Sequence, residues 1–150
     1  MVQHKIEDFA VAIMTSQRNS EVIYQKLSDR MIRVVDIQPG SVADPIHVEL
    51  RTVSIDNPGP YEALSYTWGS AANLSEISVN GHAFLATENL FAALTRFRDA
   101  TKSRSLWIDA ICINQSSTEE RSQQVRLMTE IYSKADQVLA AWSIISSDYG

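Results

Sequence analysis

The spacing of apolar residues along the chain divides it into three zones, of which the first is helical. In residues 1–30 one set of apolar side chains falls on one helical face, and a second short helix is expected from Asn19 or Ser20 onward. This zone predicts a helical leader that either packs on the domain or precedes it. The residues on the two faces are Ile6, Phe9, Ala10 and Ile13, then Val22, Ile23 and Leu27.

The second zone, residues 31–86, predicts β-strands. Residues 31–37 are rich in β-branched side chains and stop at Pro39-Gly40, residues 47–55 alternate, and residues 61–66 form the next strand. Asn80-Gly81 lies between two short apolar runs and favours a type I′ hairpin turn, which needs two positive φ angles.

The third zone, residues 87–142, alternates helix and strand. Thr87 can cap the first helix, residues 106–113 form an apolar run typical of a strand buried on both faces, and residues 138–142 predict a last buried strand. This alternation predicts an α/β fold with a partly parallel sheet flanked by helices, after a β-rich and hairpin portion. The apolar faces of the two helices are Leu90, Ala93, Leu94 and Phe97, then Val125, Met128, Tyr132 and Ala135.

The third strand is followed by only eight residues, whereas a doubly wound sheet normally continues further. We therefore expect a C-terminus that is cut, or a fold that is an incomplete version of its kind. The predicted division is a helical leader over residues 1–30 and one domain over residues 31–150.

Composition narrows the class of protein. Hydrophobic residues make up 45% of the chain and charged residues 21%, as in ordinary globular folds, and 150 residues fit one domain. The net charge of −5 argues against a nucleic-acid partner, which calls for a basic footprint. A single cysteine, three scattered histidines and no membrane-length apolar run argue against disulfides, a metal site and a membrane span. We expect a cytoplasmic protein.

Two segments carry candidate chemistry at the carboxyl ends of predicted strands, where open α/β sheets bind ligands. The first ends in Ser65, Thr67, Trp68 and Gly69; the alternative is that its aromatic residues belong to the core and Gly69 to a turn. The second places Asp109 inside an apolar run, where a carboxylate needs a hydrogen-bonding partner or a polar pocket. Asn114 and Gln115 follow that run.

A third segment opens the second helix. Ser117 and Glu120 fit the capping box, which accounts for Glu120 without a catalytic role, while Arg121 faces either a pocket or water. Cys112 lies in the apolar run and is expected to be a core residue rather than a nucleophile.

Three ordered blocks of the sequence resemble the heterokaryon incompatibility (HET) domain of filamentous fungi. The first block is YEALSYTWG at residues 61–69, the second begins TENL at residue 87, and the third is WIDAICINQ at residues 107–115. The third block continues through Glu120-Arg121 to Ala135, so the likeness runs from Met31 to Trp142.

The resemblance implies a signalling module of non-self recognition that triggers programmed cell death through self-association or contacts with protein partners. HET domains are distantly similar to TIR domains, some of which cleave NAD+ with a glutamate in the helix after the third strand. Here that segment, residues 143–150, contains no glutamate. If the module is a TIR-like enzyme, its catalytic acid lies beyond the chain end or is replaced by another residue, for which Glu120 is the best substitute in the chain. The alternatives are a signalling module that is no enzyme and an inactive HET fragment.

We expect no NAD+ hydrolysis by this chain and no resident cofactor; the alternative is NAD+ as a substrate, or as a ligand that stacks on Trp68. The sequence departs from the HET pattern at Ser70, where an acid is usual, and after Trp142, where Leu-Gly is usual.

Overall fold

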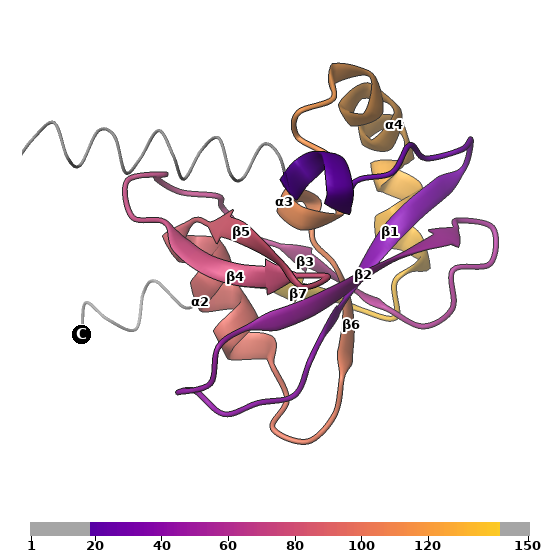
Figure 1. Ribbon diagram of the computed structural model, residues 1–150. Helices are drawn as coiled ribbons and strands as arrows, with labels where there is room; N and C mark the ends of the chain where they lie inside the picture. The colour runs from indigo at the N-terminus through magenta and orange to yellow at the C-terminus, as the bar shows by residue number, and fades with distance from the viewer. Residues whose placement is uncertain (1–18, 142–150) are drawn as a thin grey trace, which may run out of the picture.

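A seven-stranded mixed sheet organises the chain in a computed structural model that describes residues 19–141 (Figure 1). The strand order is β5-β4-β2-β1-β6-β3-β7, so the prediction of an α/β fold with a partly parallel sheet is confirmed. The strands are β1 (Met31–Ile37), β2 (His47–Ser54), β3 (Glu62–Ser65), β4 (Ser75–Val79), β5 (His82–Ala86), β6 (Arg104–Trp107) and β7 (Val138–Ala140). The helices are α2 (Glu88–Phe97), α3 (Asp109–Cys112) and α4 (Thr118–Lys134).

The β-rich zone forms two antiparallel pairs, of which the turn residues predict the second. β1 pairs with β2 along its whole length, and β4 pairs with β5 across Asn80-Gly81. Asn80 and Gly81 have φ angles of 51° and 79°, which is the pair of positive values that a type I′ turn requires. Local turn chemistry therefore determines this part of the fold.

β3 of the second zone and β6 and β7 of the third are adjacent and parallel, as the alternation of strand and helix predicts. β3 lies between β6 and β7 and pairs in parallel with both. Helix α2 connects β5 to β6 and lies beside the β4-β5 hairpin (Figure 1). Helix α4 follows α3 after β6, leads to β7 and lies beside β1. β1 joins the two halves because it pairs antiparallel with β6.

The prediction of one continuous strand over residues 106–113 is wrong. The strand ends at Trp107, and residues 109–112 turn into α3, because the backbone carbonyl of Ile108 accepts hydrogen bonds from the amides of Ile111 and Cys112. A short apolar run is compatible with a buried strand and with a buried helical turn alike. The turn brings Asp109 to the end of β6 rather than into the sheet.

The prediction that the last strand is buried is also wrong for its described part. β7 is a three-residue edge strand, and Val138 is 51% exposed. It pairs only with β3 among the described strands, so one side chain row and one backbone edge face outward. Trp142, the end of the predicted strand, lies outside the described residues.

Helix α4 packs Met128, Tyr132 and Ala135 against the core, as predicted, but Val125 does not belong to this face, and two polar residues are buried beside it. Val125 is 60% exposed, whereas Glu120, Gln124 and Ile131 are buried. The buried polar pair finds partners in the N-terminal part of the chain: Glu120 binds Arg33, and Gln124 donates to the carbonyl of Met31. Apolar periodicity alone does not reveal such a face.

The predicted leader is only partly within the described residues. Residues 19–23 are helical, but the helix ends there, so Leu27 is not part of it as predicted. Ile23 is buried in the main core. The predicted face with Ile6, Phe9, Ala10 and Ile13 lies outside the described residues, as does the segment 143–150.

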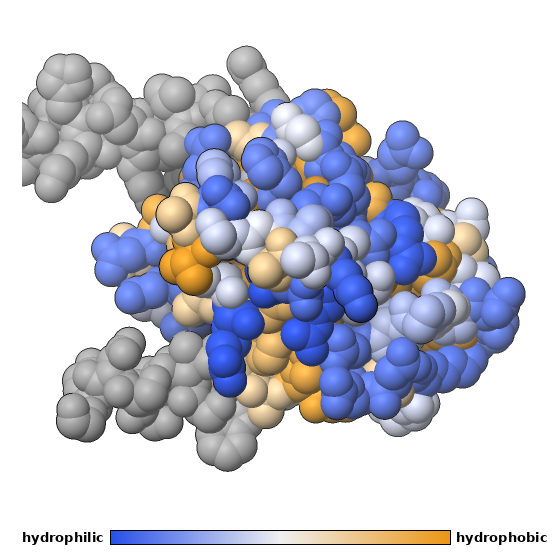
Figure 2. Space-filling model, turned by 90° about the horizontal axis from the view of Figure 1, so that it is seen from below, coloured by the Kyte–Doolittle hydropathy of each residue, from blue (hydrophilic) through white to orange (hydrophobic). Residues whose placement is uncertain are grey.

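The core is continuous across both halves of the sheet. Trp107, Tyr61 and Ile32 are its largest fully buried side chains, and Figure 2 shows hydrophilic residues over most of one molecular face with small hydrophobic patches between them. Within residues 19–141, no helix has the length and apolar character needed to cross a membrane.

Candidate functional site

The carboxyl ends of β3, β6 and β7 meet at one edge of the sheet, and this edge carries Trp68 and Asp109. The indole N–H of Trp68 donates to both carboxylate oxygens of Asp109, at 3.0 and 3.1 Å. Trp68 remains 41% exposed, so the interpretation of this residue as a core aromatic is wrong. The contact joins two loops that lie 41 residues apart in the sequence.

Asn89 fixes the loop that carries Trp68. Its side-chain amide, in the first turn of α2, donates to the backbone carbonyl of Thr67 at 2.8 Å. Gly69 has a φ of +72°, and a Cβ there would lie 3.0 Å from the Cγ of Asn89. Both the backbone angle and the close approach therefore require glycine at this position.

Asp109 is a half-buried carboxylate whose hydrogen-bond donors are neutral. Besides Trp68, the amide of Ala110 donates to its Oδ1 at 2.8 Å. Desolvation by burial raises the pKa of the Asp109 carboxyl, although the bonds from Trp68 and Ala110 act in the opposite direction. Among residues 19–141, no lysine, arginine or histidine forms an ion pair with Asp109.

Aromatic side chains support this edge from within. Trp107 packs edge-to-face on Tyr132, with ring centroids 5.5 Å apart, and the Tyr132 hydroxyl donates to the carbonyl of Leu64 at 3.2 Å. The Tyr66 hydroxyl is buried without a hydrogen-bond partner among the described residues. Burial, and to a smaller extent the charge of Asp109, raises the pKa of Tyr66. Buried aromatic side chains therefore lie beneath the loop that carries Trp68.

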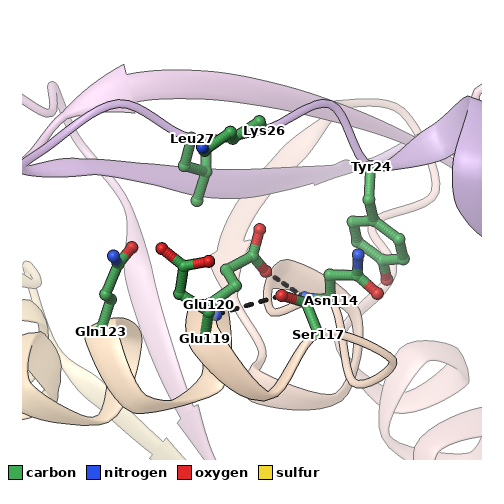
Figure 3. Close-up of a pocket in the computed structure, with 8 residues that line it drawn as sticks. All are labelled: Tyr24, Lys26, Leu27, Asn114, Ser117, Glu119, Glu120 and Gln123. Carbon is green, nitrogen blue, oxygen red and sulfur yellow. Dashed lines mark hydrogen bonds between the residues drawn. The ribbon is translucent and has the colours of Figure 1, made fainter.

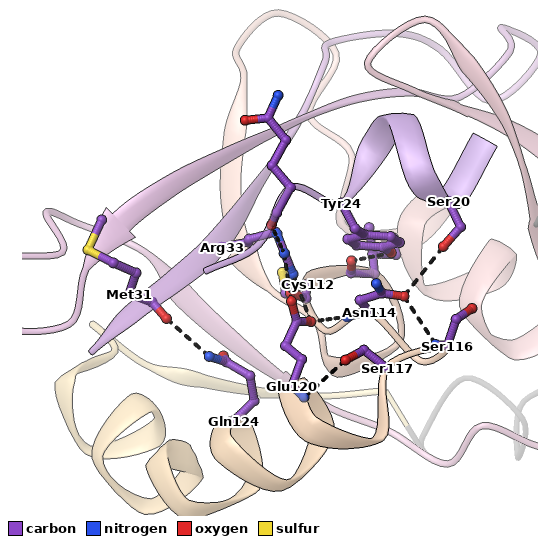
Figure 4. Close-up of polar contacts among 12 residues, drawn as sticks. Ser20, Tyr24, Met31, Arg33, Cys112, Asn114, Ser116, Ser117, Glu120 and Gln124 are labelled. Carbon is purple, nitrogen blue, oxygen red and sulfur yellow. Dashed lines mark hydrogen bonds and ion pairs between the residues drawn. The ribbon is translucent and has the colours of Figure 1, made fainter. Parts of the chain in front are cut away.

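A second polar cluster surrounds the buried ion pair of Arg33 and Glu120 (Figure 4). The Arg33 guanidinium reaches Glu120 with two nitrogens, at 2.7 and 2.9 Å, and also donates to the carbonyls of Cys112 and Gln25. The ring of Tyr24 lies under it, 4.9 Å from the guanidinium carbon to the ring centroid. This pair ties β1, α3 and α4 together.

The ion pair gives Glu120 a role other than the capping role that the sequence predicts. Ser117 accepts a hydrogen bond from the Glu120 amide at 3.2 Å, as the capping box predicts. The Glu120 carboxylate, however, does not complete the box: it binds Arg33 and accepts from the amide of Asn114. Glu120 is therefore a buried, charge-compensated residue.

A cleft of about 260 Å³ opens between residues 24–27 and the first turns of α4 (Figure 3). Lys26 and Leu27 face Glu119 and Gln123 across it, and Tyr24 lies above Asn114. The Tyr24 hydroxyl donates to the carbonyl of Ile111 at 2.6 Å, which holds the wall of the cleft to α3.

The structure brings only part of the predicted pocket together. Trp68, Gly69 and Asp109 meet, and Gln115 joins them because its amide donates to the backbone carbonyl of Asp109 at 3.0 Å. The side chains of Ser65, Thr67 and Arg121 are exposed and make no hydrogen bond with these residues in the described structure. Asn114 turns to the other cluster through Ser20 and Glu120.

Sequence reasoning missed Asn89 and Arg33 as site residues. Asn89 stands in the second of the resembling blocks, and that block was the one available signal for it. Arg33 interrupts an apolar strand, which is the same signal that singled out Asp109.

Cys112 is fully buried as expected, and desolvation raises the pKa of its thiol to about 12. The described residues contain no group of three or more His, Cys, Asp and Glu side chains that could hold a metal ion.

Comparison with known proteins places the chain in a family. The heterokaryon incompatibility protein (HET) family matches residues 61–150, a span that contains Trp68, Asn89, Asp109 and Glu120. The chain belongs to the HET family. β1 and β2 lie outside the matched span; β1 pairs with β6 inside it, and β2 pairs with β1 and β4.

A curated relative of this HET chain is Heterokaryon incompatibility protein 6, OR allele, from Neurospora crassa, which is 42% identical over 122 residues. The match covers 72% of this chain and 18% of the relative, so the chain spans less than a fifth of the relative's length. No solved structure matches the chain.

Proposed function

We propose that this HET chain is a signalling module of fungal heterokaryon incompatibility, which takes part in non-self recognition and promotes cell death through protein contacts. The name of the Neurospora crassa relative supports the first part. The observation that carries the proposal is the meeting of the three family blocks at one edge. Thr67-Trp68, Asn89 and Asp109 are linked by hydrogen bonds and leave an exposed tryptophan.

A fixed, partly exposed tryptophan fits a contact surface for a protein. Tryptophan is enriched among the residues that dominate binding energy in interfaces, and rigid side chains lose little entropy on binding. Trp68 is fixed through Asp109 and through the loop that Asn89 holds. The proposed contacts include those between copies of the chain.

The environment of Glu120 supports binding rather than NAD+ cleavage. Glycosidic cleavage needs a carboxylate that stabilises positive charge on the substrate in the transition state. Glu120 already faces the guanidinium of Arg33 and is only 8% exposed. Its charge is therefore compensated within the fold.

The proposal is tested with a chimera in which the full chain replaces the matched segment of the Neurospora crassa relative, in a strain without the native copy. We expect the chimera to restore death of fused cells with an incompatible tester, scored by uptake of a vital dye. Trp68→Ala is expected to abolish it at equal protein level. Val42→Ala is the matched control, because Val42 is 85% exposed and lies outside this edge.

Death that is unaffected by Trp68→Ala would contradict the assignment to this edge, and a chimera without activity would contradict the module itself. The purified chain is also incubated with NAD+. Nicotinamide release that Glu120→Gln abolishes, while the destabilising core change Trp107→Ala leaves it in place, would replace the proposal with an enzymatic one.

A further inference from the structure

Asp109 has no cationic partner among residues 19–141 at the edge described above. It is half-buried, and within that part of the chain its carboxylate accepts hydrogen bonds only from the indole of Trp68 and the amide of Ala110. Other partly buried carboxylates among residues 19–141 have a positive partner: Glu62 binds Arg104, Asp36 binds Arg51 and Glu120 binds Arg33. A carboxylate that is removed from water gains most from an opposite charge with hydrogen-bond donors.

Trp68 adds a second feature that favours a cation. Its indole is 41% exposed, and the N–H points at Asp109, so the edge of the ring is occupied while part of its surface is open to a ligand. A cation over an indole face is attracted to the ring electrons. Because the indole N–H donates to a carboxylate, a negative charge lies next to the same ring and also attracts a cation. A cation that stacks on Trp68 therefore also lies near Asp109.

We propose that Trp68 and Asp109 form a receptor for the guanidinium group of an arginine side chain presented by a partner protein. This inference rests on the proposed function, since it names the chemistry of the partner at the same edge. Arginine is favoured over lysine because its planar guanidinium stacks on an aromatic ring and donates two parallel hydrogen bonds to a carboxylate. The Oδ2 atom of Asp109 accepts only the 3.1 Å bond from Trp68, so it retains acceptor capacity.

Asn89 and Gln115 act as positioning residues in this receptor. Asn89 holds the carbonyl of Thr67, and Gln115 holds the carbonyl of Asp109, so each loop is fixed from outside the contact. The carboxylate also disfavours the phosphates of a nucleotide at the same ring. A protein cation is thus the ligand class that the charges select.

The test uses the full chain and the peptide acetyl-Gly-Arg-Gly-amide, followed by the indole N–H signals in ¹⁵N nuclear magnetic resonance spectra. The Trp68 signal is assigned by its loss in Trp68→Phe. We expect the arginine peptide to shift this signal in a saturable way. The same peptide with citrulline, which has the shape of arginine without its charge, is expected to bind about tenfold more weakly.

Asp109→Asn keeps an acceptor for the indole and removes the charge, so it is expected to weaken arginine binding by about fivefold or more. Glu76→Gln removes an exposed carboxylate on β4 and is expected to change nothing. Unchanged Trp107 signals show that the variants are folded. Equal binding of citrulline or lysine peptides, an unaffected Asp109→Asn variant, or a Trp68 shift by NAD+ but not by arginine would each overturn the proposal. The cell-death assay with the chimera tests the proposed function, and its result does not depend on whether the partner's ligand group is an arginine.

Discussion

Replacing Glu120 with glutamine removes the negative charge from the ion pair that joins β1 to α4. Arg33 is 2% exposed and Glu120 8%, and the two groups form two hydrogen bonds of 2.7 and 2.9 Å. Glutamine has nearly the same shape, so the change leaves the guanidinium buried without its counter-charge. Removal of one partner of a buried pair costs about 3–5 kcal/mol.

This loss is a large fraction of the total stability of a domain, which is about 5–15 kcal/mol. For a chain of this size we expect the midpoint of thermal unfolding to fall by roughly 10 °C. The assay is urea unfolding followed by circular dichroism. Glu119→Gln is the matched control, because Glu119 is the exposed neighbour in the same helical turn, and it is expected to cost less than about 1 kcal/mol.

A double variant separates the ion pair from simple packing. Arg33→Met with Glu120→Leu removes both charges, and it is expected to be more stable than Glu120→Gln, because no uncompensated charge remains. The carbonyls of Cys112 and Gln25 lose their donor in this variant, at a cost of about 1 kcal/mol each. The reasoning fails if Glu120→Gln stays within about 1 kcal/mol of the wild type, or if the losses of Arg33→Met and Glu120→Leu simply add.

Four further predictions concern the core, the edge and the extent of the fold. Trp107→Ala is expected to destabilise the chain by about 3–5 kcal/mol, and Tyr132→Ala by about 3 kcal/mol, since their rings pack together; unchanged thermal melts would disprove this. Asp109→Asn is expected to cost less stability than Asp109→Leu in denaturant titrations. Because burial raises the pKa of Asp109 above its value in the unfolded chain, the stability of the wild type falls as the pH rises above about 4, the ordinary pKa of an aspartate. Asp109→Asn lacks this titration, so its free energy of unfolding is expected to gain relative to wild type over that rise, and a constant difference would refute the reasoning. Cys112 is expected to react with a thiol reagent at pH 8 only on unfolding, so rapid labelling of the folded chain would contradict its burial. A piece limited to residues 61–150 is expected to be insoluble, because it leaves the β6 edge open and Glu120 without Arg33; a cooperative melt of that piece would show otherwise.

The β4-β5 hairpin could be predicted because its signal is local, and the parallel pairing of β3 with β6 and β7 because of the alternation of strand and helix. Pro39-Gly40 ends β1, Asn80-Gly81 turns the hairpin, and Thr87 accepts a hydrogen bond from the amide of Leu90 at the start of α2. Each signal acts within about four residues, through φ angles or capping bonds. The alternation of apolar runs and amphipathic helices then favours parallel neighbours.

The candidate site could be predicted only in part, because its contacts join residues far apart in the chain. Asp109 stood out as an acid among apolar residues, and its bond to Trp68 matches the expected neighbourhood. Arg121 and Asn114 were grouped with it through sequence proximity, yet α3 turns the chain and sends Asn114 to Glu120. The sequence indicates that Asp109 needs a hydrogen-bond partner, but the tertiary structure determines which residue that partner is.

By itself the sequence determined the Asn80-Gly81 turn, the starts of α2 and α4, the α/β class and the HET membership of this chain, since these depend on residues close together or on ordered motifs. Only the tertiary structure decided that residues 109–112 form a helix, that Val125 faces outward and that Glu120 faces Arg33. The ion pair spans 87 positions, so no local period encodes it. Burial of a charge depends on the counter-charge that the folded chain brings to it, and that counter-charge exists only once β1 and α4 have packed together.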